Sequence, residues 1–168
     1  MALADNKSFM KIEARLEGNQ VKGHRSTILY GQEAVEYQAN EKHKQDSIVS
    51  NPESNASLKN KLTVTNLKVK KQENDRALIE EEFDFVLQTD RTDDHLYINP
   101  MLFPHLKSNP FIQTERVLPI EFPYPYKFTM LATLTLPEGY EVEETPQPQV
   151  IRTQGDGLQC KYMIIIIE

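Results

Sequence analysis

Apolar and charged residues alternate strictly near the start of the chain. The apolar members are Met10, Ile12, Ala14 and Leu16. A period of two with one charged face predicts a half-buried β-strand. Gly18-Asn19 follows and is typical of a hairpin turn, so Val21–Tyr30 is expected to be the return strand. Gly23 within this run predicts a bulge or a close backbone approach.

The pattern then changes to helical spacing. Ala34, Tyr37 and Glu41 recur on one face in a stretch dominated by Gln, Glu, Ala and Lys, which predicts a helix near residues 31–46. From Leu62 the β pattern returns. The apolar parity changes at Asn66, which indicates a β-bulge or a bend of that strand.

The second half of the chain is rich in proline and in short apolar runs. Asn99–Pro110 carries prolines among large apolar residues, so it cannot be a regular strand or a long helix. The alternation of Phe128–Leu136 predicts a strand that ends in a turn at Pro137-Glu-Gly139. Further short strands are expected at Tyr140–Glu144, Gln149–Thr153 and Leu158–Ile167.

These elements predict a mainly β fold, an antiparallel β-sandwich-like domain with one helix near residues 31–46. The expected boundaries are a disordered tail at residues 1–8, a hairpin plus helix at 9–58 and a β-rich domain at 59–168. Met163–Ile167 is apolar on both faces, which is typical of a central strand paired on both sides. We therefore expect the chain to be a fragment, or a partner or missing segment to cover this strand.

Composition narrows the class of protein. The chain has 168 residues, of which 39% are hydrophobic and 26% charged, as expected of a globular domain. The net charge of −6 disfavours a nucleic-acid binder. No apolar run approaches the roughly 20 residues of a membrane helix. The N-terminus does not have the pattern of a signal peptide.

Cys160 is the one cysteine, which excludes an intramolecular disulfide and a zinc site built on paired thiolates. A thiol enzyme would need a histidine beside it, and the chain offers His24, His43, His95 and His105. The position of Cys160 between Leu158 and Tyr162 instead favours a buried structural residue.

Two acidic groups invite a chemical interpretation. Asp93, Asp94 and His95 would be metal ligands, although three adjacent residues seldom converge on one ion, and a solvated turn is favoured. Glu80 and Glu82 offer paired carboxylates, but the alternation places them on the exposed strand face and leaves Glu81 as the interruption of the apolar face.

Aromatic and basic residues form two more sets. Phe122, Tyr124 and Tyr126 share parity in an extended, proline-spaced segment, and they form either an aromatic binding platform or a cap on the core. A small basic cluster predicts a solvent-facing strand face or a protected sheet edge. Its members are Lys59, Lys61, Lys68, Lys70 and Lys71.

An ordered set of sequence segments indicates a family resemblance in addition to the hydrophobic pattern. The segments are Glu81–Leu87, Leu96–Phe103, Asn109–Phe111, Glu115-Arg116, Pro119–Tyr124 and Thr135–Val142. In this order and spacing they resemble the all-β domain of unknown function that follows the transglutaminase-like core in three-part bacterial proteins. Glu17-Gly-Asn, Val21-Lys-Gly23 and Tyr30-Gly31 are similar to the link between that core and the domain.

The resemblance implies a non-catalytic accessory module that packs on a transglutaminase-like Cys-His-Asp core, with no catalytic, cofactor-binding or metal-binding residues of its own. It also implies a periplasmic or cell-envelope location. The expected interaction surface comprises Phe103, Phe111, Phe122, Tyr124 and Tyr126. The alternative is an autonomous peptide- or carbohydrate-binding module that uses Phe122, Tyr124 and Tyr126.

Overall fold

The computed structural model describes residues 6–39, 61–72, 78–92, 94–104, 123–153 and 157–167. The chain divides into two compact units, Met1–Pro137 and Glu138–Glu168. The unit boundary therefore differs from the predicted one after residue 58. The N-terminal hairpin is not a separate part, because its second strand pairs with a strand that begins at Leu78.

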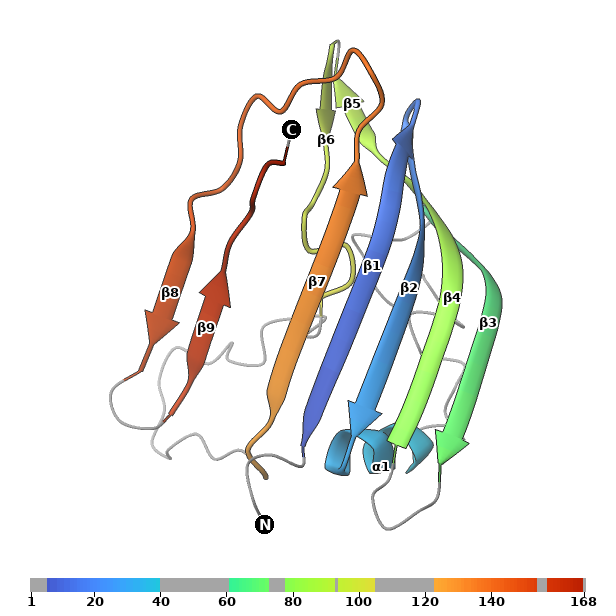
Figure 1. The fold of residues 1–168 in the computed structure, drawn as a ribbon, viewed down its shortest axis with the longest axis vertical. Helices are drawn as coiled ribbons and strands as arrows, with labels where there is room; N and C mark the ends of the chain where they lie inside the picture. Colours follow the sequence, from blue (N-terminus) through green and yellow to red (C-terminus); the bar gives the residue numbers. More distant parts are fainter. Residues whose placement is uncertain are drawn as a thin grey trace, which may run out of the picture. The chain divides into compact units, whose positions relative to one another are not determined.

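A five-stranded sheet forms the first unit, in the order β3-β4-β2-β1-β7 (Figure 1). The strands are β1 (Lys7–Glu17), β2 (Gln20–Tyr30), β3 (Leu62–Gln72), β4 (Leu78–Gln88) and β7 (Lys127–Thr135). The mainly β class with one short helix is confirmed. The sheet is mixed, however, because β7 pairs parallel to β1 whereas the other neighbours are antiparallel.

One face of this sheet carries the core. Alternate residues of β1 from Met10 to Leu16 are buried, as the alternation predicts, and they pack with Phe83 and Phe85 of β4. Leu102 and Phe103 lie in the same hydrophobic cluster, and the Phe103 ring packs edge-on against both phenylalanines. The proline-rich stretch therefore contributes to the core of the first unit.

Three short elements add to the sheet in the described part of the first unit. The helix α1 (Gln32–Ala39) lies at one end of the sheet, and β5 (Asp90–Thr92) pairs with β6 (His95–Tyr97) in a small hairpin (Figure 1). Residues 40–46 of the predicted helix lie outside the described residues. The polar residues Asp90–Thr92 form the strand β5 because they find a partner strand in β6.

Asn6 joins three parts of the first unit. Its side chain accepts a hydrogen bond from the backbone N–H of Gln32 at 2.9 Å and donates one to the carbonyl of Pro125 at 3.2 Å. Its own carbonyl accepts from the N–H of Lys127. Asn6 is 2% exposed. The expected disordered tail of residues 1–8 is therefore wrong from Asn6 onward, because these contacts hold the start of β1.

Local turn and bulge predictions are confirmed. Gly18 has a positive φ of 62° in the turn between β1 and β2. Asn66 has φ 55°, and the β3–β4 register shifts between Thr65 and Lys68. A Cβ at Gly23 would lie 2.5 Å from the carbonyl oxygen of Glu13, so this glycine permits a close backbone approach.

The second unit contains one hairpin, formed by β8 (Gln149–Arg152) and β9 (Gln159–Tyr162). The strand predicted at Tyr140–Glu144 is wrong, and the last strand ends at Tyr162 rather than Ile167. In both places the described residues provide no neighbouring strand to pair with. None of the described residues of this unit is buried.

Candidate functional site

A charged cluster interrupts the core face of the first unit. Arg25 of β2 and Glu81 of β4 are 9% and 7% exposed, and the Arg25 Nη2 lies 3.4 Å from the Glu81 Oε1. Tyr37 of α1 donates its hydroxyl to the Glu81 Oε2 at 2.5 Å. Thr27 accepts a hydrogen bond from the Arg25 Nε at 2.9 Å. The cluster thereby links α1 to β2 and β4.

Two aromatic rings lie beside the Arg25 guanidinium. Its Cζ lies 4.9 Å from the ring centroid of Phe83 and 5.2 Å from that of Phe103. Burial lowers the pKa of Arg25, and the Glu81 carboxylate opposes this effect. Sequence reasoning identified Glu81 as an interruption but missed Arg25, which breaks the core face of β2 in the same way. The β2–β4 register explains why Arg25 and Glu81 meet, because it places Thr27, the hydrogen-bond partner of Arg25, opposite Glu81.

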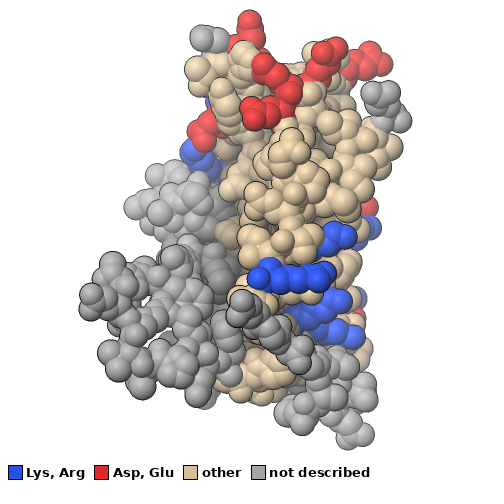
Figure 2. All heavy atoms as spheres, turned by 90° about the vertical axis from the view of Figure 1, so that its left-hand side faces the viewer, with Lys and Arg blue, Asp and Glu red and all other residues tan. Residues whose placement is uncertain are grey.

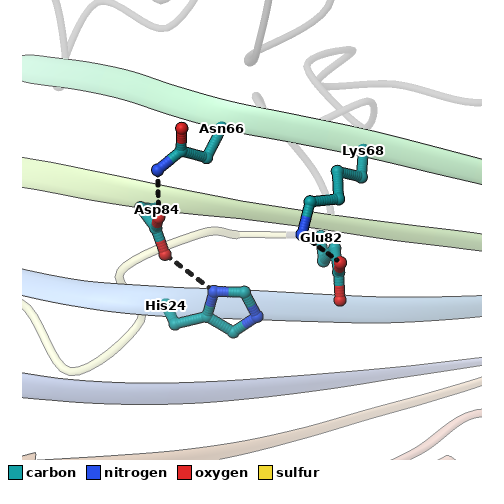
Figure 3. A network of polar contacts seen from close by, with 5 residues as sticks. All are labelled: His24, Asn66, Lys68, Glu82 and Asp84. Carbon is teal, nitrogen blue, oxygen red and sulfur yellow. Dashed lines mark hydrogen bonds and ion pairs between the residues drawn. The ribbon is translucent and has the colours of Figure 1, made fainter.

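A second polar network lies on the opposite face of the sheet (Figure 3). The Asp84 carboxylate lies 2.8 Å from the His24 Nδ1 and accepts a hydrogen bond from the Asn66 side-chain amide at 2.7 Å. The Asn66 hydrogen bond, followed by that of His24, lowers the pKa of Asp84. The three residues come from β4, β2 and the bulge of β3. The bulge therefore positions the Asn66 amide against its neighbour strand.

The basic residues of β3 lie at the edge of the sheet. Lys68 pairs with Glu82 at 3.2 Å, in line with the placement of Glu80 and Glu82 on the face opposite the core (Figure 3). Lys61 contacts Asp90 at 2.6 Å. Lys59 lies outside the described residues. This arrangement fits the protected edge that the sequence predicted.

The predicted aromatic surface is only partly a surface. Phe103 is 1% exposed and packs edge-on against Phe83 and Phe85, so its assignment to an interaction surface is wrong. Tyr124 and Tyr126 are half-buried. The Tyr124 hydroxyl donates to Glu33 at 3.4 Å, and burial raises the pKa of this phenol. Phe111 and Phe122 lie outside the described residues.

Cys160 is exposed on β9, which corrects its expected place in a core. The reason is that the second unit has a single two-stranded sheet, with no second layer among its described residues. No histidine belongs to that unit. His43 and His105 lie outside the described residues, and His24 and His95 belong to the first unit.

The acidic turn provides no metal centre in the described part of the chain, where no group of three or more His, Cys, Asp or Glu side chains is placed to hold an ion. Asp93 lies outside the described residues, whereas Asp94 and His95 are exposed. Among the described residues, no helix has the length and apolar character needed to cross a membrane.

The second unit exposes many large apolar side chains, which we call the apolar surface. Ile165, Ile166 and Ile167 are 67%, 58% and 89% exposed. The other members are Tyr140, Val142, Val150, Ile151, Leu158 and Met163. In Figure 2 the acidic side chains gather at the upper end of the face, Lys and Arg side chains lie in its lower half, and uncharged residues lie between them. Large exposed apolar areas on a soluble protein commonly mark a site that binds a partner.

Comparison with known protein families finds a match for part of the chain. Residues 94–164 match the profile of a family described as a domain of unknown function with a solved structure, DUF3858. This stretch is similar to DUF3858. The match spans β6, β7 and the β8–β9 hairpin and leaves β1 to β5 outside. No curated protein and no solved structure is significantly similar to the chain.

Proposed function

We propose that the chain is a non-catalytic interaction module that docks on another protein domain through the apolar surface of its second unit. The exposure of Ile151 and Ile165, at 55% and 67%, carries this proposal. A two-stranded hairpin is marginally stable by itself in water, and burial of its apolar side chains against a partner would stabilise it.

The partner that we propose is a transglutaminase-like core, on the strength of the resemblance in the sequence. Several of the segments that carry the resemblance, from Leu96 to Val142, lie inside the DUF3858 match. Within the described part of the second unit, β8 and β9 pair only with each other, so each has an edge with free backbone groups. Strand addition at such an edge, combined with side-chain pockets, is a common mode of recognition.

The test is binding of the chain to a separately expressed transglutaminase-like core, measured by titration calorimetry. Ile151→Asp and Ile165→Asp should each weaken binding at least about tenfold, because a charge would replace a buried apolar contact. Leu131→Asp is the matched control. Leu131 is 53% exposed, close to the 55% of Ile151, but belongs to β7 of the first unit.

If both isoleucine variants bind with the affinity of the wild type and give the same circular dichroism spectrum, the proposed surface is contradicted. An equal loss in Leu131→Asp would assign the effect to net charge. No binding of the wild-type chain would remove the proposed partner. The alternative platform of Phe122, Tyr124 and Tyr126 receives less support, because Tyr124 is half-buried and its hydroxyl already contacts Glu33.

A further inference from the structure

A small pocket opens on the core-facing side of the five-stranded sheet, within the first unit. Its volume is about 140 Å³, and its lining includes Phe103 and the side chains of neighbouring strands. A single water needs about 10–15 Å³ of such space, so the pocket has room for a ligand larger than one water. The polar lining residues are Ser8, Arg25 and Thr27, and the apolar ones include Met10, Leu29 and Phe128.

Strand register brings these residues together. Ser8 lies opposite Leu29 of β2 and Phe128 of β7, and the next inward-facing pair along the strands is Met10 and Thr27. Arg25 is two residues before Thr27 and donates from its Nε to the Thr27 hydroxyl. The Arg25 side chain is thereby directed along β2 toward Thr27, and its Nη2 lies beside Glu81 of β4.

The hydrogen-bond donors of Ser8 and Arg25 outnumber the acceptors that the described residues offer them. The Ser8 side chain is 3% exposed as a residue, and its buried Oγ has no hydrogen-bond partner among the described residues. A guanidinium offers five N–H donors. In the described part of the chain Arg25 makes one hydrogen bond, to Thr27, and an ion pair with Glu81 at 3.4 Å. Glu81 also accepts from Tyr37. Buried polar groups in native proteins nearly always have partners, so these donors call for an acceptor.

We propose that this pocket binds a carboxylate attached to a small apolar group. Arg25 and Ser8 supply N–H and O–H donors, and Thr27 accepts from Arg25 and so keeps its own hydroxyl proton to donate. Carboxylate oxygens match the planar donor geometry of a guanidinium. Met10, Leu29 and Phe128 provide the apolar wall for the hydrocarbon part. A doubly charged phosphate fits less well, because the Glu81 carboxylate is adjacent to Arg25.

This site is separate from the apolar surface proposed above, and its test is independent. The ¹⁵N-labelled full-length chain is titrated with isobutyrate and, in parallel, with the neutral isobutyramide, while NMR follows the backbone amides and the Arg25 Nε–H. Isobutyrate should bind saturably and shift the resonances of Ser8, Arg25 and Thr27. Isobutyramide should bind at least about tenfold more weakly, because it lacks the charge that strengthens a hydrogen bond to a guanidinium.

Ser8→Ala should weaken isobutyrate binding about tenfold, since it removes one hydroxyl donor to a charged group. Ser26→Ala is the matched control, because Ser26 lies on the opposite face of β2, and its affinity should equal that of the wild type. The unfolding midpoint checks that both variants are folded. Absence of saturable shifts, equal affinity for acid and amide, or unchanged affinity in Ser8→Ala would overturn the proposal.

A second arm distinguishes the sources of the carboxylate. A short peptide that ends in a valine carboxylate is compared with the same peptide amidated at its C-terminus. Tighter binding of the acid peptide than of isobutyrate assigns the pocket to peptide ends. Tighter binding of isobutyrate assigns it to free small acids. Both results retain the carboxylate site, which the small-probe outcomes named above would overturn.

Discussion

At the residue scale, the Glu81 carboxylate offsets the free-energy cost of burying the charge of Arg25. Removal of one partner from a buried ion pair leaves an uncompensated charge and costs about 3–5 kcal/mol. We therefore expect Glu81→Ala to lower the free energy of unfolding by about that amount in urea denaturation. Glu82→Ala is the control on the opposite face, where Glu82 pairs with the exposed Lys68, and its effect should stay below about 1 kcal/mol. Equal losses in the two variants would contradict a special role for the buried pair.

The Asp84 carboxyl group provides a pH-dependent prediction at the same scale. Its folded pKa lies below the ordinary 3.8, so its contribution to stability is complete above that value and is lost as the pH falls through the folded pKa. Asn66→Gly removes the amide donor yet suits the positive φ of 55°. We expect the pKa of Asp84, followed by ¹³C NMR, to move upward in this variant. A pKa that stays in place would mean that the Asn66 hydrogen bond does not form in solution.

At the element scale, Gly23 decides whether β1 and β2 can pair closely. A Cβ there would lie 2.5 Å from the Glu13 carbonyl oxygen and 2.8 Å from the Ala14 Cβ. Gly23→Ala should therefore destabilise the chain by about 1–3 kcal/mol, as overpacking does. Urea denaturation measures the loss, with Ser26→Ala on the same strand as a control of little expected effect. A Gly23→Ala variant as stable as the control would show that the hairpin relaxes to admit the methyl group.

The elements also show which features the sequence could reveal. The turn at Gly18 and the bulge at Asn66 were predictable, because residue type and local parity determine both. The parallel pairing of Lys7 with Lys127 was not, since it depends on contacts between distant segments. The Arg25–Glu81 pair and the pocket at Ser8 were missed for the same reason. Each residue by itself is only a polar interruption, and strand register alone brings the partners together.

At the scale of the whole molecule, the core and the apolar surface belong to different units. Every buried residue of the described chain lies within Met1–Pro137. The slope of urea unfolding scales with the area that becomes exposed. A chain that ends at Pro137 should therefore unfold cooperatively with nearly the slope of the full chain, and with an unfolding free energy within about 1 kcal/mol of it.

The division into two units is tested by comparing the chain that ends at Pro137 with a chain that ends at Tyr126 and therefore also lacks β7. Phe128, Met130 and Leu134 pack against the buried cluster, and their removal should abolish the cooperative transition. The chain ending at Pro137 should also bind less of a hydrophobic dye than the full chain, because the apolar surface is gone. Loss of cooperative unfolding in the chain that ends at Pro137 would show instead that the first unit needs the second unit in order to fold. The exposed isoleucines would then contribute to folding rather than to recognition of a partner.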